Sequence, residues 1–200
     1  MAKRGPYRKG EAKRAEILQT ALEIFAVEGY RGTSLRKVAA KCGLSMPGMM
    51  HYFSSREDLL TQVLMKRDQE ASARREAPWT LPAAFEVLGE NQQTPGLVEL
   101  FVSLAAAASD PNHPAHPYFE ERYRTFRATL AERVTRAQRA GQMRADVPAA
   151  RLAMLILAVA DGIQLQWMTD RTIDMRQTFA DAFRLMNLPQ SGPGTHQGQA

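Results

Sequence analysis

Cysteine and long apolar runs are scarce in this chain of 200 residues. The longest apolar run extends from Leu152 to Ala160 and is interrupted by Asp161, whereas a membrane-spanning helix needs about 18 or more such residues. The basic start of the chain leads into charged residues rather than an apolar segment, which excludes a signal peptide. Cys42 is the only cysteine and cannot form a disulfide within the chain. We therefore expect a soluble, cytoplasmic protein that does not associate with a membrane.

Motifs of enzyme chemistry are lacking as well. The chain contains no G-x-S-x-G, no G-x-x-x-x-G-K-[ST] and no acids paired at a plausible strand end. We therefore predict neither catalysis nor a cofactor. His113, His116 and Glu120 could hold a metal ion if a helix began early, but prolines make this segment irregular and no cysteine assists, so a metal site is not predicted.

Acidic residues are too few to balance the start of the chain. Residues 1–14 hold 6 Lys and Arg against 1 Glu, a net charge of +5, and the whole chain also has a net charge of +5. A basic arm ahead of a globular unit suits contact with phosphate groups. The alternative is a solvated tail. We expect residues 1–10 to form this arm and to be partly disordered.

Alternating β-branched stretches are also few, whereas apolar residues recur with helical periodicity along the chain. We predict an all-α protein of about nine helices. An N-terminal three-helix helix-turn-helix DNA-binding domain is expected over 11–55, a larger helical ligand-binding and dimerisation domain over 56–188, and a disordered tail over 189–200. The expected helices cover about 11–28, 33–42, 45–53, 55–76, 83–92, 97–109, 115–141, 146–169 and 172–188, the last capped by Thr172.

Residues 33–53 show a helix, a glycine-containing turn and a second short helix, the pattern of a helix-turn-helix unit. In such a unit the second helix enters the major groove of DNA while the first lies across the backbone. Ser45 offers an N-cap to the second helix, and Pro47 falls in its first turn, where its missing N–H does no harm. The alternative is an ordinary helical hairpin inside a core.

Residues 14–60 resemble the TetR family of bacterial transcriptional regulators. The resemblance is close over roughly a quarter of the chain. It rests on short motifs at the helix ends: Phe25, Ala26, Gly29 and Tyr30; Thr33, Ser34 and Leu35; Val38 and Ala39; Gly43, Leu44 and Ser45; Tyr52 and Phe53; and Ser55, Arg56, Glu57, Asp58 and Leu59. It implies a homodimer that binds a DNA operator, usually as a repressor, and that a small molecule releases.

The expected DNA-binding residues lie on and around the two short helices: Thr33, Ser34, Arg36, Lys37, Ser45, Met46, Pro47, Gly48, Met50, His51, Tyr52 and Arg56. The resemblance implies backbone contacts from Thr33, Ser45, Tyr52 and Arg56, and base contacts from Met46, Pro47 and His51. One position departs from the family, which often has a Tyr where this chain has Met50. A thioether could meet a thymine methyl group there. Met49 is expected in the core.

Residues 152–159 are apolar on more than one face of a helix, so they need cover on all sides. A second copy of the chain is a natural cover, and burial within one chain is the alternative. The expected dimer-interface residues are Leu152, Leu155, Ile156, Val159, Phe179 and Phe183.

Aromatic residues in the second half could line a cavity for an effector, with Gln164 as a polar group, although the same residues also suit a core. The candidates are Trp79, Phe85, Phe101, Tyr118, Tyr123, Phe126, Gln164 and Trp167. No acid or base is evidently placed to meet a charged ligand, so a neutral or aromatic effector is expected. We hypothesise a ligand-responsive dimeric repressor on a palindromic operator. The alternatives are a sequence-tolerant architectural DNA binder and a small-molecule-binding module with a vestigial DNA function.

Overall fold

The computed structural model describes residues 5–29, 35–73 and 81–187, and every regular element in these ranges is an α-helix. The predicted all-α class is confirmed. Several expectations fall outside the described residues: the first part of the basic arm, the contacts of Thr33 and Ser34, the role of Trp79 and the disordered tail. The side chain of Phe85 is also outside them, although its backbone lies in a helix.

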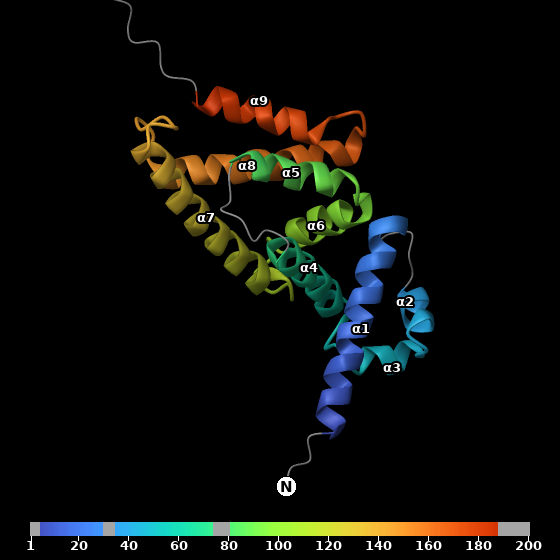
Figure 1. Cartoon of the computed structure of the whole chain (residues 1–200). Coiled ribbons are helices and arrows are strands. Elements are labelled where there is room, and N and C mark those ends of the chain that lie inside the picture. The colour runs from blue at the N-terminus through green and yellow to red at the C-terminus, as the bar shows by residue number, and fades with distance from the viewer. Residues whose placement is uncertain (1–4, 30–34, 74–80, 188–200) are drawn as a thin grey trace, which may run out of the picture.

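The N-terminal unit is built on helix α1 (Gly5–Glu28), which begins six residues before the predicted start, so that the second half of the expected arm is helical. Two short helices, α2 (Leu35–Lys41) and α3 (Met46–Met50), pack beside it (Figure 1). Helix α1 ends at Gly29, whose positive φ of 76° and N–H bond to the Phe25 carbonyl are typical of a glycine helix stop.

The core of this unit continues into the next helices. Helix α4 (Arg56–Ala73) and helix α6 (Pro95–Ala107) both pack against α1 and bury apolar side chains in the same cluster as α1, α2 and α3. Ser55 caps α4 by accepting the N–H of Asp58 at 3.0 Å, and the Asp58 carboxylate accepts the N–H of Ser54 at 2.8 Å. The predicted boundary at residue 55 therefore lies within a continuous core and remains a proposal.

The second cluster lies between the remaining helices. Helix α7 (His116–Arg139) packs along α8 (Ala149–Thr169), while α5 (Leu81–Gln92) and α8 both contact α9 (Met175–Asn187) (Figure 1). The start of α9 differs from the prediction, because Asp174 rather than Thr172 accepts the N–H of Gln177, at 2.9 Å. The hydroxyl of Thr172 instead donates to Asp170.

Helix α8 alone among the described helices is long and apolar enough to cross a membrane, by length and composition. A packed position explains its composition, because it contacts α6, α7 and α9 and buries Leu152, Ala153 and Ile163. It also carries Asp161 near its middle.

Helix α6 joins the two clusters through a close backbone contact with α1. Leu97 and Leu100 pack in the first cluster and Val98 in the second. At Gly96, a Cβ atom would lie within 3.0 Å of the Phe25 carbonyl oxygen and of the Cα and N atoms of Gly29. Only a glycine fits here, so the backbones of α1 and α6 meet without side chains between them.

Candidate functional site

The turn between α2 and α3 has the geometry of a helix-turn-helix. Gly43 adopts a positive φ of 67°, and the N–H of Leu44 returns to the Ala39 carbonyl at 2.8 Å, which closes α2. Ser45 then caps α3 by accepting the N–H of Gly48 at 3.1 Å, with Pro47 in the first turn. The N-cap and the proline position predicted from the sequence are confirmed.

Helix α3 presents one face to solvent and one to the core. Ser45, Pro47 and His51 are exposed, whereas Met49 is fully buried, as expected. Four other residues are half-buried at the edges of the exposed face: Met46, Gly48, Met50 and Tyr52. Because Met46, Met50 and Tyr52 also pack against the first core, they hold the helix in place while Ser45, Pro47 and His51 are free to reach outward.

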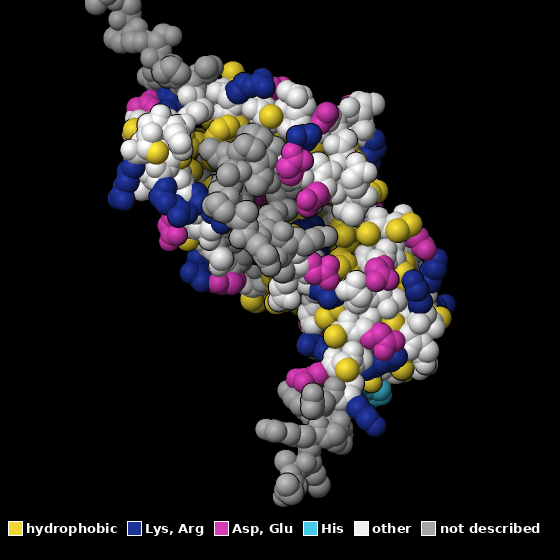
Figure 2. Space-filling view, viewed as in Figure 1, with side chains coloured by type: hydrophobic (Ala, Val, Ile, Leu, Met, Phe, Trp, Pro, Cys, Tyr) yellow, Lys and Arg dark blue, Asp and Glu magenta, His cyan; other side chains and the backbone are white. Residues whose placement is uncertain are grey.

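Basic side chains surround this face. Arg36, Lys37 and Arg56 are all exposed, and the Lys37 ammonium donates to the Glu28 carboxylate at 2.6 Å, which ties α2 to the end of α1. Lys13 donates to the Cys42 carbonyl at 2.7 Å and so fixes the turn to α1. Figure 2 shows Lys and Arg side chains around the end of the molecule formed by these helices, interspersed with acidic ones.

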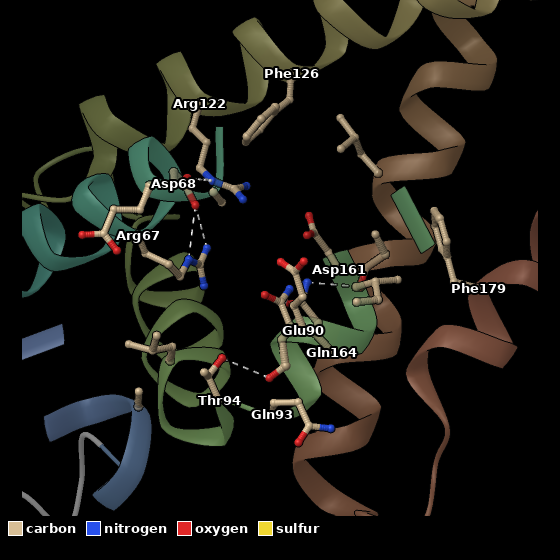
Figure 3. A pocket seen from close by; sticks show the side chains of 18 of the residues that line it. Arg67, Asp68, Glu90, Gln93, Thr94, Arg122, Phe126, Asp161, Gln164 and Phe179 are labelled. Carbon is tan, nitrogen blue, oxygen red and sulfur yellow. Dashed lines mark hydrogen bonds and ion pairs between the residues drawn. The ribbon is translucent and has the colours of Figure 1, made fainter. Parts of the chain in front are cut away.

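A cavity of about 800 Å³ opens between the N-terminal unit and the rest of the chain. Its walls come from α1, α4, α5, α6, α7, α8 and α9. Of the predicted ligand-binding residues, Phe126 and Gln164 line it (Figure 3). The structure thus brings two of the predicted residues to one cavity, and their role toward an effector remains a prediction.

Four other predicted ligand-binding residues lie outside the lining. Phe101 is buried against Phe119 in the first core, with ring centroids 5.7 Å apart. Trp167 is buried near the end of α8, where the Arg171 guanidinium lies 3.8 Å from its ring centroid. The hydroxyls of Tyr118 and Tyr123 bond to carboxylates. For these four the expectation is corrected, because packing uses them as core or as supports of the cavity wall.

The polar wall of the cavity is centred on Asp68 of α4. One oxygen accepts from Arg67 at 2.9 Å, and the other accepts from Arg122 at 2.8 Å and from the Tyr118 hydroxyl at 2.9 Å. Arg122 also stacks on aromatic rings, with its guanidinium 4.7 Å from the Phe101 centroid and 4.6 Å from that of Phe126. This network fastens α4 to α7 at the cavity.

Burial and charge set the protonation of this network. Burial alone would raise the pKa of Asp68, but the neighbouring Arg67 and Arg122 outweigh it and hold that pKa below its usual value. Burial and the negative charge of Asp68 raise the pKa of Tyr118, so the phenol stays protonated and donates its hydrogen bond. At neutral pH the wall therefore holds two guanidinium groups and one carboxylate.

A second polar group faces this wall across the cavity. The close view in Figure 3 shows Arg67, Asp68 and Arg122 on one side and Glu90, Asp161 and Gln164 on the other. Asp161 accepts the Tyr123 hydroxyl at 2.7 Å, yet burial dominates and raises the pKa of its carboxyl. Since charged residues line both sides, the expectation that no acid or base is placed to meet a ligand is wrong.

Sequence reasoning missed these charged residues because they come from distant parts of the chain. Asp68 and Arg122 are 54 positions apart, and nothing in either local pattern indicates that they meet. The adjacent pair Arg67 and Asp68 lies one helical turn after Val63 and Leu64, which are buried on α4. A charged pair on the buried side of this helix was the available signal.

Most of the predicted dimer-interface residues are buried in the core of one subunit. Leu152, Ile156, Phe179 and Phe183 are buried in the second core, which corrects their assignment to a surface. Leu155 is 41% exposed and Val159 is half-buried. The large exposed apolar side chains of α8 and α9 are Met154, Leu155, Leu165 and Leu185. The composition of α8 did predict an apolar surface, and Leu155 is the one predicted residue among its large exposed side chains.

The two histidines before and at the start of α7 have structural roles. His113 accepts the N–H of Ala115 at 3.2 Å, and the ring of His116 bonds to the Ala108 carbonyl at 2.8 Å. Within the described ranges, no group of three or more His, Cys, Asp or Glu side chains could hold a metal ion.

Fold and surface together define a helix-turn-helix regulator with an internal cavity. The model of the tetR family of bacterial regulatory proteins matches residues 17–63, and that of the BetI-type transcriptional repressor C-terminal domain matches residues 83–184. The chain belongs to the TetR family, and the prediction of a DNA-binding transcriptional regulator is confirmed.

The similarity to known regulators covers most of the chain. The transcriptional repressor AcnR of Corynebacterium diphtheriae is 30% identical over 165 residues, which cover 75% of this chain and 78% of the relative. A TetR transcription regulator from Haloarcula marismortui has a TM-score of 0.72 at 20% identity, covering 88% of this chain and 97% of that one. A regulator from Saccharomonospora viridis in complex with choline has a TM-score of 0.68 at 22% identity, covering 87% and 96%.

Proposed function

We propose that the protein is a homodimeric repressor that binds a near-palindromic operator through α3 and is released when a small molecule occupies the cavity. Pro47 and His51 lie on the outward face that would reach base edges, and Ser45 beside them suits a backbone contact. Arg36 and Arg56 are exposed beside this face and suit phosphate contacts. In a dimer, the α3 helices of the two chains would lie about 34 Å apart or somewhat more, in successive major grooves.

The exposed apolar residues of α8 supply the surface for pairing. Leu155 and Leu165 are 41% and 56% exposed, and Ala158 and Gly162 lie between them at helical spacing on the same face. A stripe of this kind favours helix packing against a second copy, because it places small residues between large apolar ones. Two TetR-type chains joined there would form a four-helix contact from α8 and α9.

The observation that carries the proposed regulation is that α1 belongs to both units. Gln19, Leu22, Glu23 and Ala26 of α1 line the cavity, while the same helix packs against α2. An effector that binds one position of α1 more tightly than another shifts the equilibrium between the two positions. The difference in affinity sets the size of that shift, and α3 moves with α1. The S. viridis relative with bound choline supports a small-molecule site in proteins of this fold.

This role is one of binding in the cytoplasm, where the DNA is, and it needs no catalytic step. The regulator family that the chain belongs to supports both statements.

A binding-site selection on random DNA, followed by fluorescence anisotropy on the selected sequence, tests the proposal. We expect a near-palindromic site that binds two chains. The variant His51→Ala should weaken binding to this site by about tenfold, since a good base contact contributes about 1–3 kcal/mol of discrimination. The exposed Arg139, at the far end of α7, provides the control Arg139→Gln, which should bind as the wild type does.

Other results would contradict particular parts of the proposal. Binding that ignores sequence and is insensitive to His51→Ala would favour an architectural DNA binder. Absence of binding at low salt would indicate a vestigial DNA function. A reporter gene that becomes more active when the regulator binds its promoter would exclude repression.

A further inference from the structure

Arg67 lines the cavity and has a buried hydrogen-bond donor without an acceptor. The Nε and Nη2 atoms of Arg67 donate to the same Asp68 oxygen at 3.2 and 2.9 Å, whereas its Nη1 atom is buried and makes no hydrogen bond. An unsatisfied buried donor costs about 1–3 kcal/mol, and more when it is charged. An acceptor oxygen brought into the cavity would remove this cost if a small rotation of the guanidinium turned Nη1 toward it.

The wall formed by α4 and α7 offers two guanidinium groups, those of Arg67 and Arg122, to a negative ligand group. Arg67 and Arg122 share the single carboxylate of Asp68 on this wall, while the other acidic residues of the lining are Glu23, Glu70, Glu90 and Asp161. The carboxyl of Asp161 across the cavity accepts the Tyr123 hydroxyl at 2.7 Å, and burial raises its pKa. Apolar side chains complete the cavity: Leu130, Ile156, Leu157 and Phe126.

A cationic ligand is disfavoured at the wall formed by α4 and α7. There its charge would meet two guanidinium groups that share one carboxylate. The ring of Phe126, which could attract a cation, is already covered by Arg122 at 4.6 Å. At Phe126 a choline-like group would therefore compete with Arg122 for the aromatic face.

We propose that the effector is an organic anion with an apolar body, and that its anionic oxygen atoms bind the guanidinium group of Arg67. This inference depends on the proposed function, in which the effector occupies this cavity. The ligand anion competes with Asp68 for Arg67 and Arg122. Because Asp68 bonds both Tyr118 and Arg122 of α7, the competition loosens the attachment of α4 to α7. The ligand thereby acts on the helix that follows the DNA-reading unit.

Two fluorescent dyes with the same ring system test the charge preference. 1-Anilinonaphthalene-8-sulfonate carries an anionic group, and N-phenyl-1-naphthylamine lacks it. We expect the full-length protein to bind the anionic dye about tenfold more tightly or better, since a charge-assisted hydrogen bond contributes about 1.5–3 kcal/mol and 1.4 kcal/mol is tenfold. The variant Leu157→Trp, which fills the cavity, should abolish both signals.

Substitutions on the polar wall should act in opposite directions. Arg67→Gln should remove the preference for the anionic dye and leave binding of the neutral dye within about twofold, which also shows that the variant is folded. Asp68→Asn removes the competing carboxylate and should tighten binding of the anionic dye. Arg171→Gln, outside the cavity lining, is the matched control and should change neither affinity.

Each contrary result has a distinct meaning. Equal affinity for both dyes, or an anionic-dye affinity unchanged by Arg67→Gln, would overturn the anion proposal and leave the cavity as the effector site. Failure of both dyes to bind, or binding that persists in Leu157→Trp, would overturn the cavity site itself and with it this part of the proposed function.

Discussion

The contact between α1 and α6 predicts a large effect from a very small substitution, Gly96→Ala. The added methyl carbon would lie within 3.0 Å of three backbone atoms of Phe25 and Gly29. Backbone atoms cannot rotate away as a side chain can, so the cost should reach about 3 kcal/mol, the upper end of typical overpacking. Replacing a helical glycine with alanine stabilises the helix by about 0.5–1 kcal/mol, which offsets part of this cost. The net loss is therefore about 2 kcal/mol.

For a protein of this size, about 2 kcal/mol corresponds to a decrease in Tm of about 4–8 °C. Thermal unfolding followed by circular dichroism at fixed protein concentration measures it, because Tm depends on concentration in a dimer. The matched control is Gly89→Ala in α5, where a Cβ atom would lie 3.6 Å from the nearest atom, an ordinary contact. This control should be as stable as the wild type or slightly more stable. Equal Tm values for the two variants would refute the direct backbone contact between α1 and α6.

The remaining predictions concern the cap of α3, the buried carboxyl and the DNA surface. Ser45→Ala removes the cap that accepts the Gly48 N–H and should cost about 1 kcal/mol in urea unfolding, while Ser45→Asp should retain most of the stability; a full loss with Asp would contradict the cap. The pKa of Asp161 is raised by burial, so its charged form opposes folding as the pH rises through that pKa. Asp161→Asn, which keeps an acceptor for the Tyr123 hydroxyl, should therefore raise Tm at neutral pH, and the gain should shrink as the pH falls toward the ordinary aspartate pKa of 3.8; a lower Tm at neutral pH would show that the charge is stabilising. Arg56→Gln removes one phosphate contact from each chain of the dimer, so it should lower DNA affinity evenly across sequences and reduce the salt slope of binding by about 2; an unchanged slope would mean that Arg56 does not bind phosphate.

Local chemistry in the sequence predicted the helical class and the helix-turn-helix pattern, and the resemblance to the TetR family identified that pattern as a DNA-binding unit. Helical periodicity gave the all-α class, and the glycines at positions 29 and 43 marked helix ends that the structure places in the left-handed region. The burial of Met49 followed from its spacing within α3. These features depend on residues a few positions apart, which is the range over which sequence patterns are informative.

Features that depend on tertiary packing were predicted poorly. The apolar residues of α8 suit both a core and an interface, and the arrangement of α6, α7 and α9 around it determines that Leu152 and Ile156 are buried while Leu155 is exposed. The polar wall was missed for the same reason, because Asp68 and Arg122 meet only after α4 and α7 have packed. The pattern of residue types along one helix does not show which other helices pack against it.

The shared use of α1 constrains how this regulator could acquire a new ligand. Substitutions at Gln19 or Glu23 would alter the cavity and, at the same time, the helix that carries the reading unit. Changes at Thr129 or Leu157, on the side formed by α7 and α8, would reshape the cavity far from the DNA surface. Natural divergence and laboratory redesign should therefore both proceed most freely on the α7 and α8 side, with the α1 side held nearly constant.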